Sequence, residues 1–125
     1  MVLKRGVTMS IGIGVQVQKE ILFVDLTGEL DQLTTAKVKN KILSMMENND
    51  VKHIVFNLKR LGFMDSSGIG VILGRYKQLK KTGGRVFVVG MNPVVSKVFY
   101  MSGLNQIITI IDDEKAIGKM LEEVS

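Results

Sequence analysis

Short apolar segments alternate with segments of helical periodicity along the chain, and this order limits the fold more than any other feature. Two strands are expected first, at 15–18 and 21–27, with Lys19 and Glu20 forming a tight hairpin between them. After them, helices alternate with strands expected at 54–58, 86–89 and 107–111, and the chain closes on a helix. Such alternation gives parallel neighbouring strands joined by helical crossovers. The sequence therefore predicts an α/β fold, a small mixed sheet with an antiparallel opening hairpin and about four packed helices.

The expected helices have one apolar face each and recognisable end signals. In the first helix, apolar side chains recur at i, i+4, i+7 and i+8, at Val38, Ile42, Met45 and Met46. The second helix follows Asp65 and stops at a glycine pair, and its expected buried face contains Ile69, Ile72, Leu73, Tyr76 and Leu79. Pro93 is typical of the first turn of a third helix, which Gly103 ends. Asp31 and Asp112–Asp113 are expected to cap the first and the last helix.

Length and cysteine content bound the class of protein. A chain of 125 residues fits one domain with a hydrophobic core, and we expect a short tail at 1–8 and the folded domain at 9–125. The absence of cysteine excludes disulfides, thiol nucleophiles and thiolate metal sites, and it fits a cytoplasmic location. The apolar runs are too short to span a bilayer, and the basic N-terminus lacks the apolar stretch of a signal peptide.

The positive charge of the chain is modest. The formal net charge is +5, and lysines cluster on two of the expected helices. Aromatic residues are few and occupy core-like positions, so no base-stacking surface is expected. The charge pattern therefore favours an acidic protein partner over nucleic acid.

A polar loop with two adjacent hydroxyls opens directly into the second helix. Asp65 is a good N-cap, because its carboxylate accepts hydrogen bonds from free backbone N–H groups of the first turn. Ser66 and Ser67 then lie at the positive end of the helix dipole, where added negative charge is tolerated. The loop is a candidate phosphorylation site, and the alternative is that it only caps the helix.

Four segments together indicate a family. Residues 63–80 read FMDSSGIGVILGRYKQLK, and LTGELD, HIVFNL and FYMSGL stand at 26–31, 53–58 and 99–104. In order and spacing these segments resemble the bacterial anti-sigma factor antagonists, small proteins of the STAS domain family, and the sporulation-specific branch is the most similar. The resemblance extends from about Met9 to the C-terminus. It implies the STAS fold, a small mixed sheet with helices packed against it.

The resemblance also implies a switching function without catalysis or a cofactor. In this family the unmodified protein binds an anti-sigma factor, which is also a serine kinase, and thereby frees a sigma factor. The kinase uses ATP to phosphorylate the antagonist, which then dissociates, and a serine phosphatase restores it. By motif the acceptor is Ser66. The expected partner surface consists of Asp31, Asp65, Ser67, Gly68 and Ile69.

Other functions remain open at this point. Within the family, the alternatives are a general-stress antagonist or a STAS subunit of another signalling complex. In a different class, Ser66, Asp65 and the single histidine, His53, suggest a small serine hydrolase, although no G-x-S-x-G elbow is present. One histidine without cysteine does not make a typical zinc site, and we expect His53 to be a polar residue at a strand edge.

Two glycines of the second helix also need an explanation. Gly70 and Gly74 are four residues apart and therefore share a helix face. No Gly-Lys-Ser/Thr follows them, so a phosphate-binding loop is not indicated. We expect these glycines to allow a close approach of the helix to the sheet.

Overall fold

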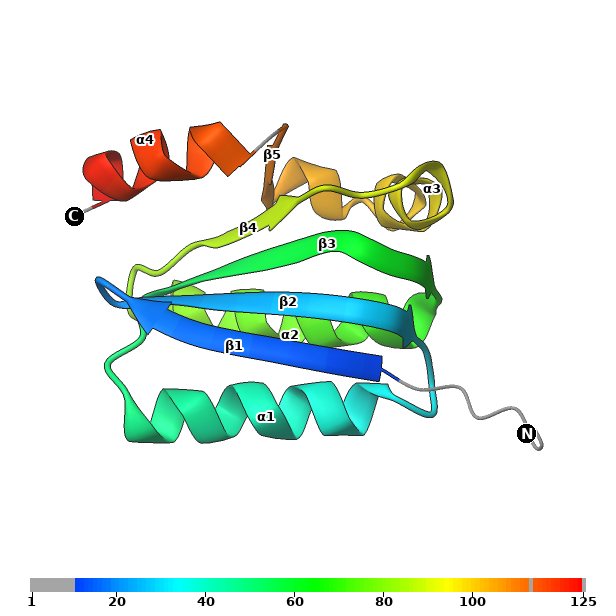
Figure 1. Ribbon diagram of the computed structural model, residues 1–125, viewed down its shortest axis with the longest axis horizontal. Coiled ribbons are helices and arrows are strands. Elements are labelled where there is room, and N and C mark those ends of the chain that lie inside the picture. Colours follow the sequence, from blue (N-terminus) through cyan, green and yellow to red (C-terminus); the bar gives the residue numbers. More distant parts are fainter. Residues whose placement is uncertain (1–10, 113, 125) are drawn as a thin grey trace.

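The protein is a five-stranded sheet covered by helices (Figure 1), and the computed structural model describes residues 11–112 and 114–124. The strands are β1 (Ile11–Gln18), β2 (Ile21–Leu30), β3 (His53–Met64), β4 (Val86–Val89) and β5 (Thr109–Ile111). The helices are α1 (Thr35–Asn48), α2 (Ser66–Lys80), α3 (Pro93–Met101) and α4 (Glu114–Val124), with a 3-10 turn, η1 (Leu104–Gln106), before β5. The predicted tail at 1–8 and the predicted cap Asp113 lie outside the described residues.

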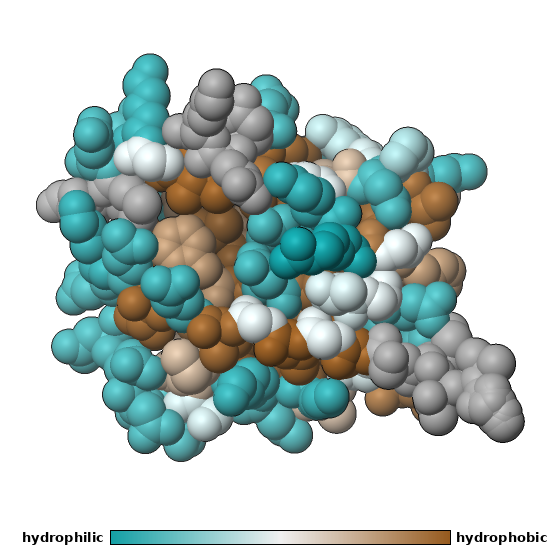
Figure 2. Space-filling view, viewed as in Figure 1, coloured by the Kyte–Doolittle hydropathy of each residue, from teal (hydrophilic) through white to brown (hydrophobic). Residues whose placement is uncertain are grey.

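The sheet has the predicted mixed topology. Its strands lie in sequence order, β1 pairs antiparallel with β2, and every later pair is parallel. The larger apolar core lies on the face covered by α1, α2 and α3, whereas a smaller cluster on the other face packs against α4. Figure 2 shows a band of apolar side chains across the middle of one face of the molecule, bordered by polar side chains. None of the helices among the described residues is both long enough and apolar enough to cross a bilayer.

The opening hairpin forms at the predicted residues without a glycine in the turn. Lys19 and Glu20 have φ angles of 51° and 63°, as a two-residue turn between twisted strands requires. The ladder beyond the turn is continuous over the whole length of β1, and it holds the two residues in this left-handed conformation. The first strand begins four residues earlier than predicted, since β1 starts at Ile11 and both Gly12 and Gly14 lie inside the ladder, opposite Thr27 and Asp25.

The third strand is much longer than predicted. Its first half, where Ile54 to Asn57 pair with β4, is the part that the apolar run indicates. Its second half continues beside the end of β2, where Gly28 pairs with Leu61 and Leu30 with Met64 after two shifts of register. This second half pairs with β2 alone, so it can contain exposed polar residues such as Lys59 and Arg60. Because of these polar residues, the apolar pattern of the sequence did not predict a strand there. The extension places the start of α2 beside the end of β2.

Candidate functional site

The candidate site lies at one end of the sheet, where β2 and β3 stop and α1 and α2 begin (Figure 1). The carboxyl ends of parallel strands meet at one edge of a sheet, and ligand and partner sites collect there. Here the two ends are joined directly, because the backbone N–H of Asp65 donates to the carbonyl oxygen of Leu30 at 3.2 Å. The predicted site residues on the two loops therefore lie on one edge of the molecule.

Asp65 caps α2 as predicted. Its Oδ1 accepts a hydrogen bond from the backbone N–H of Ser67 at 2.8 Å. Its carbonyl oxygen accepts from Gly68 N at 3.0 Å and from Ile69 N at 3.3 Å. Ser66 is the first residue of the helix and is exposed to solvent. The helix thus starts without help from the Ser66 hydroxyl, which leaves this side chain available at the positive end of the dipole.

The glycine that allows close approach to the sheet is Gly68. It is buried, and a Cβ built on it would lie 2.6 Å from Cγ of Met64 and 3.0 Å from Cδ2 of Leu30. Both of those side chains are fully buried at the ends of β3 and β2. A larger residue at position 68 would push the first turn of α2 away from the sheet. Gly68 therefore positions Ser66, although it is itself too buried to offer a surface.

Asp31 lies at the same edge but is occupied within its own loop. Only 8% of it is exposed, and its Oδ1 accepts hydrogen bonds from Leu33 N at 2.9 Å and Thr34 N at 3.1 Å. The Asp31 backbone N–H in turn donates to Oγ1 of Thr34 at 2.9 Å. The prediction that Asp31 caps the first helix is imprecise, because Asp31 caps a turn and α1 begins only at Thr35. Its carboxylate holds the loop shape that precedes α1.

Two exposed apolar side chains flank this edge, and the sequence reasoning did not include them. Leu33 is 77% exposed in the loop after β2, and Phe63 is 39% exposed near the end of β3. Exposed apolar side chains next to polar loops are common where a protein partner docks. The sequence could have indicated this surface through Leu33, which is an apolar residue inside an otherwise polar turn.

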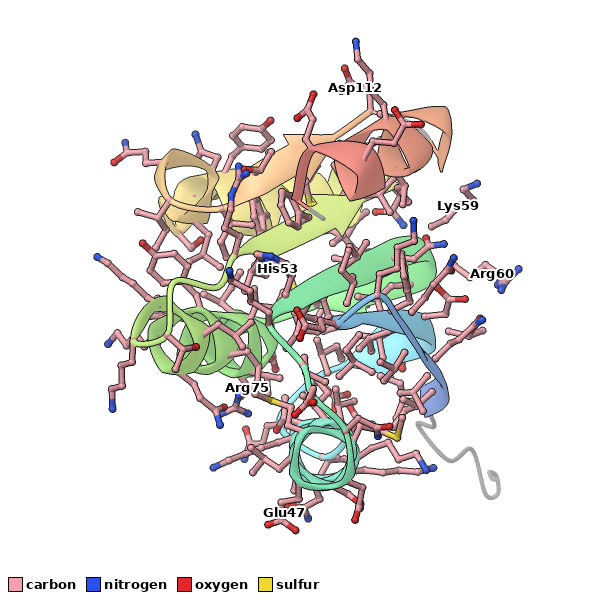
Figure 3. The ribbon with its side chains drawn as sticks, turned by 90° about the vertical axis from the view of Figure 1, so that its left-hand side faces the viewer. Glu47, His53, Lys59, Arg60, Arg75 and Asp112 are labelled. Carbon is pink, nitrogen blue, oxygen red and sulfur yellow. The ribbon has the colours of Figure 1, made fainter. Side chains whose placement is uncertain are left out.

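His53 lies at the opposite end of β3 from Ser66, which excludes a triad with Ser66. Figure 3 labels His53 among the side chains drawn on the ribbon. His53 begins β3 and Ser66 follows the end of that 12-residue strand. At about 3.3 Å per residue a strand of 12 residues spans on the order of 40 Å, whereas catalytic partners must be within hydrogen-bond distance. His53 is the first residue of β3, at the strand edge where it was expected, but its side chain is buried.

The His53 imidazole is held in its neutral form. Its Nδ1 accepts a hydrogen bond from the backbone N–H of Arg85 at 3.0 Å, which requires an unprotonated nitrogen. Burial lowers the pKa of His53 below its usual value of 6.5, and the charges of Lys52 and Arg85 lower the pKa further. In the folded state His53 thus binds a proton less readily than in the unfolded chain.

This shift predicts a pH dependence of stability. Because the unfolded state binds more protons, the contribution of His53 is complete above pH 6.5 and is lost as pH falls toward the lowered pKa of the folded protein. The free energy of unfolding should decrease by up to about 1.4 kcal/mol per pH unit in that window. Urea titrations between pH 7.5 and about 5 measure this slope. His53→Asn keeps a hydrogen-bond acceptor without the titration, so an equal slope in this variant would contradict the assignment.

The expectation for Gly70 and Gly74 is wrong. A Cβ built on either glycine meets no atom within 4 Å, so neither one allows an approach to the sheet. Both instead line a pocket between α1 and α2, together with Ser67, Val71 and other residues. The helix face that contains them is turned toward solvent because Gly68 and Ile72 already occupy the side that faces the sheet.

Among the described residues, no cluster of three or more histidine, aspartate and glutamate side chains is arranged to hold a metal ion.

Comparison with known proteins identifies the relatives of this chain. The STAS domain matches residues 13–117 of the chain. The anti-sigma F factor antagonist of Paenibacillus polymyxa is 42% identical over 94% of this chain and 100% of its own length. The anti-sigma-B factor antagonist of Bacillus subtilis is 29% identical, over 82% of this chain and 92% of its own.

The solved structures of one relative cover two phosphorylation states. The unphosphorylated anti-sigma factor antagonist SpoIIAA superimposes with a TM-score of 0.76 and 34% identity, over 87% of this chain and 96% of its own. The phosphorylated form of SpoIIAA, a Bacillus cell fate determinant, superimposes with a TM-score of 0.69 and 34% identity, over 87% of this chain and 99% of its own. A protein of the same fold and similar sequence is thus known with and without phosphate.

Proposed function

Since the chain belongs to the STAS domain family, we propose that it is an anti-sigma factor antagonist controlled by phosphorylation of Ser66. The unmodified protein binds an anti-sigma factor that is also a serine kinase, and this binding releases a sigma factor. The kinase transfers phosphate from ATP to Ser66, the complex dissociates, and a serine phosphatase in the same cytoplasm reverses the modification. The antagonist itself has no catalytic activity and needs no cofactor.

The exposed Ser66 at the N-terminus of α2 is the observation that carries this proposal. A kinase needs an accessible hydroxyl, and the helix dipole favours the added phosphate by about 0.3–1 kcal/mol. Ser67 is less suited, because it is partly buried and lines the pocket between α1 and α2. The higher identity to the sigma F antagonist than to the sigma-B antagonist supports the sporulation branch over the general-stress branch.

The partner surface surrounds Ser66. Partly exposed Ile69 continues it along α2, and the exposed Leu33 and Phe63 extend it across the ends of the two strands. Asp31, Asp65 and Gly68 act beneath this surface, by holding the two loops in shape. The function of a serine hydrolase is not supported, because His53 is at the other end of β3.

Phosphate should be found on Ser66 and not on Ser67. The protein is incubated with the purified partner kinase and ATP, and the modified peptide is mapped by mass spectrometry. Ser66→Ala should abolish labelling, and Ser67→Ala should remain a substrate because Ser67 is turned toward the pocket between the helices. Labelling of Ser66→Ala with phosphate on Ser67 would contradict the assignment.

Phosphorylation should change binding without changing the fold. The modification adds about −1.5 to −2 charge, which takes the net charge from +5 to roughly +3. The first turn of α2 is already satisfied by Asp65, and the phosphate projects into solvent, so no packed group has to move. Circular dichroism and thermal unfolding of the two forms should agree within a few degrees. A melting temperature lower by about 10 °C or more would instead indicate a switch that unfolds the protein.

A further inference from the structure

Arg75 is a buried cation, and two of its guanidinium nitrogens have no partner among the described residues. Only 8% of it is exposed, and its Nε and Nη1 atoms are buried with no hydrogen bond to any described residue. Burial lowers the pKa of the Arg75 guanidinium, but an arginine stays protonated at neutral pH. A buried charge without a partner is costly, and buried charges in proteins are normally paired or hydrogen-bonded. The described residues supply no acceptor for these two nitrogens, so the charge of Arg75 is not compensated by them.

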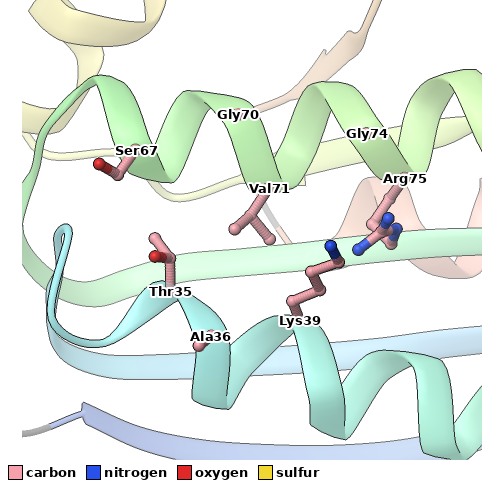
Figure 4. A pocket seen from close by; sticks show the side chains of 8 residues that line it. All are labelled: Thr35, Ala36, Lys39, Ser67, Gly70, Val71, Gly74 and Arg75. Atoms are coloured by element: carbon pink, nitrogen blue, oxygen red, sulfur yellow. The ribbon is translucent and has the colours of Figure 1, made fainter.

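The unpaired guanidinium opens into the pocket between α1 and α2. This pocket has a volume of about 380 Å³, and Figure 4 shows Arg75 and Lys39 directed toward one another across it. The residues that line it include no acidic side chain. Two positively charged side chains therefore face this pocket. An anion placed between them would be attracted by both.

The shape of the pocket leaves room for such an anion. Gly70 and Gly74 lie along the α2 side, where a Cβ at either position would meet no atom within 4 Å. Each glycine costs about 1 kcal/mol of helix propensity relative to alanine. Because neither residue has a side chain, the pocket between α1 and α2 stays open. The end of the pocket away from Arg75 reaches Ser67, the neighbour of the proposed phosphorylation site.

We propose that this pocket is an oxyanion-binding site, in which Arg75 and Lys39 together hold a carboxylate or phosphate group. The guanidinium donates to the oxyanion from Nη2, which is not one of its two buried nitrogens, and the lysine ammonium adds a second charge. The oxyanion belongs either to a small free molecule or to an acidic side chain of the proposed anti-sigma partner. The second source rests on the proposed function, and the first does not.

Inorganic phosphate is the probe for the site itself. NMR titration at constant ionic strength should give saturable shifts of the backbone amides of Gly70 and Gly74 and of the Arg75 side-chain Nε–Hε signal. Arg75→Met keeps the apolar stem and should weaken phosphate binding by about tenfold or more. Lys39→Met should weaken it to a smaller degree. Lys77→Met is the matched control, because it removes one exposed charge of the same helix outside the pocket.

A second arm distinguishes the two sources. If the partner supplies the oxyanion, Arg75→Met should bind the anti-sigma kinase about tenfold more weakly, and phosphate should compete with the kinase. If the ligand is a free anion, Arg75→Met should bind the kinase like the wild type but lose the phosphate response. Either result supports the site. The proposal is overturned if phosphate shifts are equal in wild type and Arg75→Met and kinase binding is equal too. Failure of the wild type to bind the kinase would refute the proposed function only, since the phosphate arm is independent of it.

Discussion

Ser66→Asp should weaken binding to the anti-sigma kinase by more than about a hundredfold, which corresponds to roughly 3 kcal/mol. Ser66 is exposed in the free protein, but a docked partner excludes water from the start of α2. A carboxylate buried there without a matching cation loses its hydration, and that loss is large compared with the contribution of any single surface contact. The affinity is measured by titration calorimetry with ADP present.

Ser66→Ala is the matched variant for this measurement. It removes one hydroxyl and adds no charge, so it should bind the kinase within a few-fold of the wild type and resist phosphorylation. Equal affinity of wild type and Ser66→Asp would refute the electrostatic explanation. Loss of binding in Ser66→Ala would show that the hydroxyl is itself an essential contact.

Gly84→Ala should lower the free energy of unfolding by about 3 kcal/mol or more, the largest stability effect expected for a single methyl group here. A Cβ on Gly84 would overlap the carbonyl oxygen of Lys52 and would lie 3.0 Å from Cβ of Leu79. The first of these atoms belongs to the backbone, so the clash is relieved only if the chain entering β3 moves away from the end of α2. Thermal unfolding should show a melting temperature lower by roughly 10 °C or more.

Two other glycines serve as controls for Gly84→Ala. Gly83 has a φ of 78° with open space around its Cβ, so Gly83→Ala should cost only the left-handed backbone strain, about 1–2 kcal/mol. Gly74 is helical and open, so Gly74→Ala should leave stability unchanged or raise it by up to about 1 kcal/mol. A melting temperature of Gly84→Ala equal to that of Gly83→Ala would show that the close contact is not a constraint.

Helix ends and a fully apolar strand were predicted correctly, because each depends on residues that are close together in the sequence. The N-cap at Asp65, the helix start at Pro93 and the glycine stop of α2 follow from the hydrogen-bonding and backbone preferences of single residues. The fully apolar 86–89 segment indicated an interior strand, and β4 occupies those residues. These features need no knowledge of the rest of the chain, which is why they could be predicted.

Features that depend on pairing between distant segments were not predictable in the same way. The second half of β3 exists because the end of β2 lies beside it, and its polar sequence contains no sign of that neighbour. For the same reason, the close approach to the sheet was predicted for Gly70 and Gly74, whereas the structure has it at Gly68. Gly68 faces Met64 and Leu30, whereas Gly70 and Gly74 face the pocket between α1 and α2, and a shift of two residues on a helix reverses the direction.

Arg75 was missed although a signal was present. It is three residues after buried Ile72 and four before buried Leu79, so it occupies the inward stripe of α2 at a position where an apolar residue is expected. A charged residue inside an apolar stripe indicates either a buried partner or a ligand. The sequence could have posed this question, but only the structure excludes a partner among the described residues.

The most direct test of the central claim compares the native protein in its two states. Titration calorimetry measures binding of the anti-sigma kinase, with ADP present, to the unmodified protein and to the protein phosphorylated at Ser66. We predict measurable binding of the unmodified form and a Kd larger by more than about a hundredfold for the phosphorylated form, with the same circular dichroism spectrum for both. Equal dissociation constants for the two forms would contradict a switch at Ser66.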